Sequence, residues 1–301
     1  MCKLSLILQR VTVSQTRLAH ASAPIGTTNM YLLYIIFSAL FCFLILKWMK
    51  RRRYCMDVKR LDGKTVLITG GNAGIGKETA VLLAMRGARV IIACRDEEKA
   101  RKAVREIKAR SHNMNVLYME VDLANMKSIR EFSKTFLQKE KRLDILINNA
   151  ESSPSRVINL TCSSYKYQKL DFQDLNYNLF PFFTYCRSKL ANIYFTQELA
   201  HMMEGKGVTA YAVHPGYVQS NWTCHFSVLF RILVQVVMFM FFVSCEAGAQ
   251  TVVYCAVSDE VLPHNGGYFT DCRPAHLRAF ARDSGVAKKL WEASERLVKL
   301  A

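Results

Sequence analysis

Tyr185 and Lys189 stand four residues apart in the stretch "YCRSK". Residues at this spacing share one face of an α-helix. A phenol has a pKa near 10 and is a poor base at neutral pH, but a neighbouring ammonium group favours the phenolate and lowers that pKa. The pair could therefore move a proton to or from an alcohol oxygen while a nicotinamide carries a hydride. Alone, this spacing is common and is also typical of a solvated helix face.

A glycine-rich turn, "TGGNAGIG", complements this pair. It follows the β-rich run "KTVLITG" and precedes a helical pattern, so its glycines would let the backbone approach a pyrophosphate at the start of a helix. This position between strand and helix makes the motif more specific than three glycines alone, and a plain tight turn is the alternative. The cofactor-binding residues expected here are Gly70, Asn72, Gly74, Ile75 and Gly76.

Two further side chains bear on the choice of cofactor. Arg95 ends the second apolar run, about 20 residues past Gly76, where an acidic residue suits a ribose hydroxyl and a basic one suits a 2′-phosphate. This favours NADP over NAD, unless Arg95 merely begins a solvated helix. Asp122 ends the third run, where a carboxylate can reach an adenine amino group; alone, it would more often be a helix cap.

The elements that must position these residues alternate in type. Short apolar runs indicate buried strands, and helical patterns follow the first three of them. We expect strands at 64–70, 89–94, 115–123, 143–150 and from 156, with helices at 75–88, 96–110 and 128–140. This alternation predicts an α/β fold with a doubly wound parallel sheet of the Rossmann type, in a single domain over residues 61–301.

These segments together resemble the short-chain dehydrogenase/reductase family, in particular its membrane-anchored retinol dehydrogenase-like branch and, in the closing segments, its member 13 type. The resemblance covers Leu61 to Leu300 and rests on "TGGNAGIGKETA", "ACRD", "VDL", "LDILINNA", "YCRSKLANIYFTQELA", "VTAYAVHPGYVQS", "GAQT", "GGYFTDC" and "LWEASERL". It implies that Tyr185 is the general acid/base and that Lys189 lowers its pKa and holds the nicotinamide ribose. The segment from Pro215 to Val218 would line the nicotinamide, with Asn148 beside the cofactor.

One departure from the family pattern concerns the substrate oxygen. The family places a serine before the tyrosine to polarise that oxygen, and an ungapped match puts Cys162 at this position, with Ser163 next to it. A thiol is a weak hydrogen-bond donor. Either Ser163 substitutes for the missing serine, or the step is slower.

A second departure follows "LDILINNA". In the family, "NNAG" is followed by roughly 35 residues that form a loop and a crossover helix with an active-site asparagine. A connection between parallel strands normally needs a dozen or more residues. Here Glu151 replaces the glycine, and only Glu151 to Ser155 precede the next apolar run. We therefore expect one crossover helix to be missing and apolar sheet surface to be exposed.

The charge distribution argues for a membrane rather than a nucleic acid. The net charge is +17, and in the first 60 residues Asp57 is the only acidic residue. The basic residues there flank a charge-free apolar run, 31–46, near the lower limit for crossing a bilayer of about 30 Å. We expect a single-pass anchor over 30–49 and a basic linker over 50–60. The catalytic domain would face the cytosol at the endoplasmic reticulum; a buried helix is the alternative.

Other segments leave more than one interpretation open. Residues 1–29 lack acidic residues, which suits a mitochondrial presequence, a mitochondrial membrane location, or an unstructured leader. The apolar stretch 226–244 contains Arg231 and Gln235, and could be a lid for a lipid-like substrate, a core helix or a second span. The ten cysteines show no zinc spacing, so we expect reduced thiols and no metal.

The sequence thus predicts NADP(H)-dependent interconversion of a hydrophobic, retinoid-like alcohol and its carbonyl compound, with membrane lipid as the other partner. The alternative is a catalytically inactive, membrane-anchored protein that binds nucleotide or acts through partners. The shortened segment after Ala150 is the feature that favours this alternative.

Overall fold

A computed structural model describes residues 31–32, 34–43, 53–147, 155–170, 172, 181–218 and 242–298. The chain divides into two compact units, Met1–Arg51 and Arg52–Ala301. In the first unit, the described residues are helical and carry exposed apolar side chains, such as Ile35 at 64% and Phe37 at 66%. Among the described residues, no helix combines the length and the apolarity needed to cross a bilayer.

The second unit is an α/β domain. Its strands are β1 (Thr65–Thr69), β2 (Arg89–Cys94), β3 (Val116–Glu120), β4 (Ile145–Ile147), β5 (Ser155–Leu160), β6 (Val208–His214), β7 (Tyr268–Thr270) and β8 (Arg273–Ala275). Its helices are α3 (Gly74–Met85), α4 (Glu97–Ser111), α5 (Met126–Lys139), α6 (Pro181–Met202), α8 (Cys245–Val257) and α9 (Ser284–Val298). Short 3₁₀ helices are η1 (Ser163–Tyr167), η3 (Leu262–His264) and η4 (Ala279–Arg282).

The strands form one sheet in the order β3-β2-β1-β4-β5-β6-β7-β8. All neighbouring pairs are parallel except β7 and β8. The reversal of strand order between β1 and β4 is the topological switch point of a doubly wound sheet, where such folds bind their ligands. The predicted Rossmann-type fold class is confirmed at this level.

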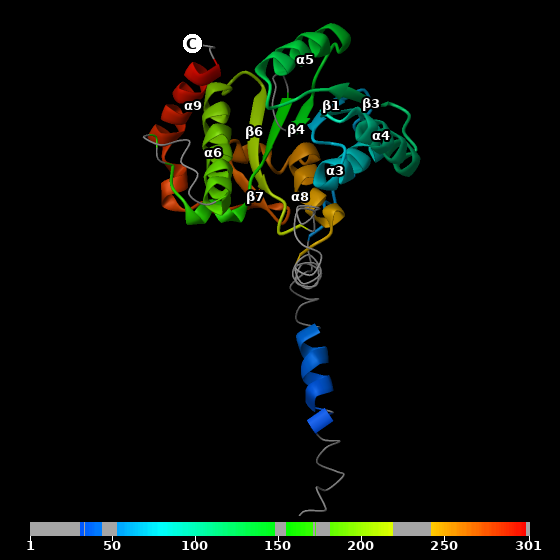
Figure 1. Ribbon diagram of the computed structural model, residues 1–301, viewed down its shortest axis with the longest axis vertical. Helices are drawn as coiled ribbons and strands as arrows, with labels where there is room; N and C mark the ends of the chain where they lie inside the picture. The colour runs from blue at the N-terminus through cyan, green and yellow to red at the C-terminus, as the bar shows by residue number, and fades with distance from the viewer. Residues whose placement is uncertain are drawn as a thin grey trace, which may run out of the picture. The chain divides into compact units, whose positions relative to one another are not determined.

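Helices cover both faces of the sheet because successive strand side chains point to opposite sides. Val66 and Ile68 of β1 pack in the same apolar cluster as side chains of α3, α4 and α8. Leu67, between them, packs instead in the cluster that includes side chains of α5 and α6. On this second face α9 lies along α6, as Figure 1 shows, and Trp291 of α9 stacks on Phe195 of α6 at 5.1 Å between ring centroids.

The connection between β4 and β5 is the unusual feature of the sheet. The two strands pair in parallel, with Ile145 opposite Arg156 and Ile147 opposite Ile158. Only residues 148–154, which lie outside the described part, join them, so the chain has no room for the usual crossover helix. Seven residues thus separate the described parts of the two strands, two more than the five, Glu151 to Ser155, that the sequence predicts.

Seven residues are long enough to lead the chain from the end of β4 back to the start of β5. A three-residue strand requires a return of roughly 10 Å along the sheet, at about 3.3 Å per residue, whereas seven residues reach more than roughly 20 Å. The exposure of apolar surface that we expected is not seen where β4 and β5 meet: Leu146 is 0% and Val157 1% exposed. Side chains of α5 and α6 pack over this face, with Trp291 against them.

Hydrogen bonds also hold the start of β5 in place. The Ser155 hydroxyl donates to the Leu143 carbonyl at 2.6 Å, and the Arg156 backbone N–H donates to the Asp144 carbonyl at 3.0 Å. The Arg156 guanidinium donates to the Ser258 carbonyl and to Asp259, at 2.5 and 2.9 Å. The register of β5 is thus defined by its neighbours at both edges.

The described part of the expected basic linker packs on this domain. The Arg53 N–H donates to Asp271 at 3.1 Å, and the Cys55 N–H donates to the Gln250 side chain at 3.2 Å. Lys59 pairs with Asp259 at 2.8 Å. These contacts place residues 53–60 within the compact unit that begins at Arg52.

Candidate active site

The glycine turn lies between β1 and α3, as the sequence predicts. Gly70 and Gly74 have φ angles of 64° and 57°, a conformation that favours glycine. A Cβ on Gly76 would lie 2.5 Å from the Gly70 carbonyl oxygen, so only a glycine fits there. No side chain caps the N-terminus of α3, and its first turn contains no acidic residue. The backbone N–H groups of this turn thus remain available to an anion.

A pocket of about 480 Å³ lies at the carboxyl ends of β1, β2 and β3. It brings together four of the predicted cofactor-binding residues, Gly70, Asn72, Arg95 and Asp122. Ile75 packs instead against the apolar core below the turn. The dimensions and the glycine cradle suit the adenosine and pyrophosphate portion of a dinucleotide.

The basic character of this pocket comes from two residues. Arg95 is exposed and forms no ion pair or hydrogen bond with the part of the chain that the structure describes. Lys99, one helical turn further on, also lines the pocket, although its ammonium group pairs with Asp96 at 2.6 Å. Sequence reasoning missed Lys99; its spacing of four residues from Arg95 was the available signal.

Asp122 occupies a turn rather than a free position. Its side chain accepts a hydrogen bond from the Ala124 N–H at 3.0 Å, and its own N–H donates to the Ser128 hydroxyl at 3.0 Å. The helix cap of α5 is Asn125, whose side chain accepts from Lys127 and Ser128. Asp122 therefore lines the pocket while one of its carboxylate oxygens holds this turn.

Tyr185 and Lys189 lie on the first turns of α6, as predicted. The Lys189 ammonium group is 5.4 Å from the centroid of the Tyr185 ring. Two hydrogen bonds fix this helix beside the end of β5: the Thr161 hydroxyl donates to the Lys189 carbonyl at 2.7 Å, and Asn192 donates to the Leu160 carbonyl at 2.8 Å. The pair thus stands at the carboxyl edge of the sheet, the same edge as the glycine turn.

Cys162 and Ser163 follow β5 but have different surroundings. The Ser163 hydroxyl donates to the hydroxyl of Tyr217 at 3.0 Å. Cys162 instead interacts with Tyr185, His214 and Ser164 through its thiol. Of the two candidates for the serine of the family pattern, Cys162 is the one that lies beside Tyr185.

Burial raises the pKa of Tyr185, and the neighbouring Cys162 thiolate raises it further. The expectation that Lys189 lowers this pKa stays a prediction. The Lys189 ammonium group lies over the face of the ring, whereas Cys162 interacts with the hydroxyl. Burial also lowers the pKa of Lys189, although the charge of Cys162 acts in the opposite direction.

Burial acts to raise the pKa of Cys162 as well, but the neighbouring side chains of His214 and Ser164 outweigh it and lower this pKa to about 6. His214 ends β6, directly before Pro215, and its ring contacts that of Tyr217 edge-on at 5.7 Å between centroids. Sequence reasoning missed His214, whereas Tyr217 lies within the segment from Pro215 to Val218 that we expected to line the nicotinamide. The stretch "HPGY" after a buried strand was the available signal, because it lies at the same edge of the sheet as Cys162.

Of the other predicted site residues, the structure describes Val218 but not Asn148. Val218 forms a bridge with Val243 and is 8% exposed, packed against Gly248 of α8. The Val243 N–H donates to the Tyr217 carbonyl at 2.8 Å, so the C-terminal end of the apolar stretch lies beside Tyr217. Asn148 and most of 226–244 lie outside the described residues, as do residues 1–29.

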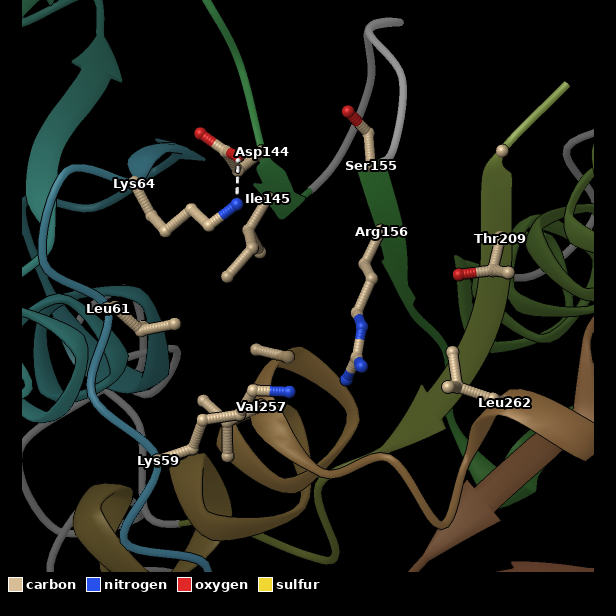
Figure 2. A pocket seen from close by; sticks show the side chains of 12 residues that line it. Lys59, Leu61, Lys64, Asp144, Ile145, Ser155, Arg156, Thr209, Val257 and Leu262 are labelled. Atoms are coloured by element: carbon tan, nitrogen blue, oxygen red, sulfur yellow. Dashed lines mark hydrogen bonds and ion pairs between the residues drawn. The ribbon is translucent and has the colours of Figure 1, made fainter.

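A second pocket, of about 260 Å³, lies at the opposite edge of the sheet, at the amino ends of β4, β5 and β6. Figure 2 shows Lys64 pointing at Asp144 there, with Arg156 on the neighbouring strand. Its cationic groups are already paired: Lys64 with Asp144 at 3.0 Å, and Lys59 and Arg156 with Asp259. Each cation that lines this pocket thus has an anionic partner, in contrast with Arg95 in the pocket at the carboxyl edge.

Comparisons with known proteins agree with this geometry. A family model described as short chain dehydrogenase matches residues 64–184. Human retinol dehydrogenase 11 is 39% identical over 286 residues, covering 82% of this chain and 89% of that protein. Bovine dehydrogenase/reductase SDR family member 13 is 36% identical over 286 residues, covering 82% and 76%.

Solved structures share the fold. A protein from Mycobacterium paratuberculosis of unassigned function is 26% identical, with a TM-score of 0.63 over 83% of this chain and 98% of that one. L-sorbose reductase from Gluconobacter frateurii, complexed with NADPH and L-sorbose, is 20% identical, with a TM-score of 0.56 over 71% and 96%.

The alignment with human retinol dehydrogenase 11 also shows a shortening. Since 82% of 301 residues is about 247, about 39 of the 286 aligned positions have no residue in this chain. The shortening is close in size to the segment expected to be missing after Ala150. The shared sequence, the sheet topology and the glycine turn lead to one assignment: this chain belongs to the short-chain dehydrogenase/reductase family and is an oxidoreductase related to the retinol dehydrogenases.

Proposed function

We propose that this protein interconverts a hydrophobic alcohol and its carbonyl compound with NADP(H). The observation that carries the proposal is the common edge of the sheet: the uncapped glycine turn, the exposed Arg95 and the Tyr185–Lys189 pair all lie at the carboxyl ends of the strands. Doubly wound folds bind their ligands at this edge.

NADP is the cofactor that the pocket fits best. The Arg95 guanidinium has no partner among the described residues and offers a planar donor set suited to a phosphate. Gly70, Gly74 and Gly76 would hold the pyrophosphate against the start of α3. When bound, the nicotinamide supplies the hydride acceptor or donor for the reaction. The NADPH complex of L-sorbose reductase, which shares the fold, agrees with this choice.

Tyr185 would handle the proton at the substrate oxygen. Because burial and the Cys162 thiolate raise the pKa of Tyr185, its hydroxyl is protonated at neutral pH and suited to act as the acid. This favours reduction of a carbonyl over oxidation of an alcohol. Lys189, buried behind the ring, would hold the nicotinamide ribose, as the family resemblance implies.

An aromatic rim supports a hydrophobic substrate. Tyr167, Phe182 and Tyr217 are 65%, 54% and 50% exposed, and the side chain of Tyr185 is itself 46% exposed. Tyr167 contacts Phe182 at 6.1 Å and Tyr217 contacts Phe242 at 5.9 Å between ring centroids. Exposed aromatic groups gathered at one site mark a surface that binds apolar ligands. The retinol dehydrogenases among the relatives agree with a retinoid-like substrate.

The site of action would be a membrane surface. The described helix within 30–49 exposes apolar side chains, and the basic cluster "KWMKRRR" follows it in sequence. We propose that this segment anchors the protein in the membrane of the endoplasmic reticulum with the catalytic domain in the cytosol. A mitochondrial membrane is the alternative location.

A second candidate function is that of a catalytically inactive nucleotide-binding protein. The specific observation in its favour is the seven-residue connection between β4 and β5, which replaces the family's crossover helix. The position of Cys162, with its thiolate against Tyr185, also departs from the family pattern.

Turnover of the full-length chain in detergent micelles separates the two candidates. We expect NADPH oxidation with a long-chain or retinoid aldehyde, and at least about a 100-fold loss in Tyr185→Phe, since a general acid contributes roughly 10²–10⁴-fold. Tyr118→Phe is the matched control, because the Tyr118 hydroxyl is buried on β3 and has no hydrogen-bond partner among the described residues. A folded chain that binds NADPH but turns over neither aldehyde nor alcohol would establish the second candidate instead.

A further inference from the structure

The Cys162 thiol lies where three elements meet. Cys162 follows β5 and is the first residue before η1. Strands β5 and β6 end side by side, and the Cys162 thiol interacts with Tyr185 of α6 and with His214 at the end of β6. It is partly exposed, whereas Cys94, Cys186 and Cys255 are buried. A reagent that enters the candidate active site can therefore reach its sulfur.

Two buried polar side chains stand beside this sulfur. His214 and Ser164 are each 6% exposed. The His214 Nδ1 and the Ser164 Oγ make no standard hydrogen bond to any atom of the described residues, yet both groups act on the thiol. Buried polar groups are rarely left without a partner, so a site that keeps two of them beside one sulfur is built for a charged or reacting group there.

The other titratable groups around the thiol complete its environment. From α6 come Tyr185, the buried Cys186 and the Lys189 ammonium, and from β7 comes Tyr268. The Lys189 ammonium group and the thiolate favour each other's charged forms. Cys162 is the only cysteine in the described part of the chain whose pKa is lowered; burial raises the pKa of Cys94, Cys186 and Cys255.

We propose that Cys162 is a nucleophilic site of covalent modification, positioned by His214 and Ser164, that takes soft carbon electrophiles of the α,β-unsaturated aldehyde class. The aromatic rim formed by Tyr167, Phe182 and Tyr217 would admit the apolar chain of such an aldehyde. The modification requires no cofactor and no turnover, so it stands or falls separately from the proposed oxidoreductase activity.

The chemistry is a conjugate addition. The thiolate sulfur forms a bond to the β-carbon, the electron pair of the carbon–carbon double bond moves to give an enolate, and the α-carbon then takes a proton from the Tyr185 hydroxyl or from water. Nothing is oxidised or reduced, and the product is a thioether aldehyde on Cys162. Because the sulfur adjoins Tyr185, the adduct would occupy the position of the substrate oxygen.

The test is alkylation of the full-length chain, followed by site-resolved mass spectrometry, with iodoacetamide and then trans-2-nonenal as probes. A thiol with its pKa near 6 is mostly ionised at pH 7, but its nucleophilicity falls with its pKa (Brønsted slope about 0.4–0.5). We therefore expect Cys162 to react with iodoacetamide roughly 20-fold faster than a free cysteine peptide at pH 6, and only about fourfold faster at pH 7.

Two variants test the positioning role of the imidazole. His214→Phe removes the polar group and keeps the ring, so the pH midpoint of Cys162 labelling should rise and its rate at pH 6 should fall roughly 10-fold. His214→Asn retains an N–H donor and should restore part of the effect. A merely structural role for His214 would change the amount of folded protein but leave the midpoint unchanged.

The buried cysteines report on folding within the same sample. If Cys162 is labelled fast while Cys186 and Cys255 stay unlabelled, and nonenal forms an adduct at Cys162, the proposal is supported. If Cys162 reacts no faster than the free peptide at pH 6, or if nonenal leaves it unmodified, the proposal is overturned. Equal labelling of Cys162, Cys186 and Cys255 would also overturn it, because the site would then not exist in the protein.

Discussion

The thiol of Cys162 lies beside the hydroxyl of Tyr185, where the family pattern has a serine, and the two groups oppose each other's ionisation. A neutral serine hydroxyl would donate a hydrogen bond at this place and carry no charge. The substitution therefore changes the protonation state of the acid/base group as well as the hydrogen bond to the substrate. Several measurable consequences depend on this pair and on the residues that surround it.

Replacing Cys162 by serine should make Tyr185 a better base. Burial would still raise the pKa of Tyr185, but the anionic neighbour that raises it further would be gone. The pH profile of alcohol oxidation should move to lower pH, with a rate at neutral pH higher by roughly 10-fold. Cys272→Ser is the matched control, because Cys272 is partly exposed and is not among the groups that shift the pKa of Tyr185. An unchanged profile in Cys162→Ser would contradict the assigned coupling.

Arg95 should determine the preference for NADP over NAD. Arg95→Glu replaces a cation that lines the pocket by an acid. The substitution should weaken NADPH binding by roughly 10- to 100-fold, since a charge-assisted hydrogen bond contributes about 1.5–3 kcal/mol. It should weaken NADH binding much less. Titration of the intrinsic fluorescence with each cofactor measures both constants. Arg101→Glu is the control, because Arg101 lies on α4, just beyond Arg95 in the sequence, and pairs with Glu97 rather than lining the pocket. Equal losses for both cofactors would remove Arg95 from the phosphate site.

Asp144 should support the fold in a pH-dependent way. It is 6% exposed and accepts hydrogen bonds from the Thr65 N–H at 2.9 Å and from Lys64 at 3.0 Å, and it also pairs with Arg142. Burial acts to raise the pKa of Asp144, but these hydrogen bonds outweigh it and hold the pKa below its ordinary value of 3.8. The stabilisation is therefore fully present above pH 3.8 and is lost as the pH falls through the lower, folded-state value.

The variant Asp144→Asn should lower the free energy of unfolding by about 2 kcal/mol at pH 7. The difference from the native chain should stay constant down to about pH 4 and shrink below it, as urea unfolding at a series of pH values would show. Asp62→Asn is the control, because its carboxylate is exposed and pairs only with Arg60 among the described residues. A difference that grows on acidification would have the wrong sign.

Trp291 should compensate for the missing crossover helix. It stacks on Phe195 and packs in the same apolar cluster as Leu146 and Val157, the residues of β4 and β5 on that face. Trp291→Ala should lower the free energy of unfolding by about 2–3 kcal/mol, through lost burial and the cavity left behind. Leu297→Ala, on the same helix with a side chain that is 75% exposed, should change it by less than about 0.5 kcal/mol. Equal effects of the two would show that α9 does not cover this face.

Much of the scaffold could be predicted because its signals are local. The strand Arg89–Cys94 has the predicted bounds, since a continuous apolar run is enclosed by charged residues. The placement of Tyr185 and Lys189 on one helix follows from their spacing alone. The glycine turn was recognisable because its strand and helix adjoin it in the chain.

The features that were missed depend on residues far apart in sequence. The raised pKa of Tyr185 depends on burial and then on Cys162, which follows β5 rather than lying on the helix of Tyr185. His214 acts on Cys162 only because β5 and β6 end side by side. The burial of Leu146 likewise depends on Trp291 near the other end of the domain.

Thermal unfolding of the full-length chain with and without NADPH tests the central claim most directly: that this shortened chain still forms a nucleotide-binding oxidoreductase domain. We predict a cooperative transition that NADPH at 100 times its dissociation constant stabilises by about 2.7 kcal/mol, with a smaller effect of NADH at the same concentration. A chain carrying the crossover segment of human retinol dehydrogenase 11 in place of residues 148–154 is the reference. The absence of a cooperative, NADPH-sensitive transition in the native chain, with one present in this reference, would contradict the account.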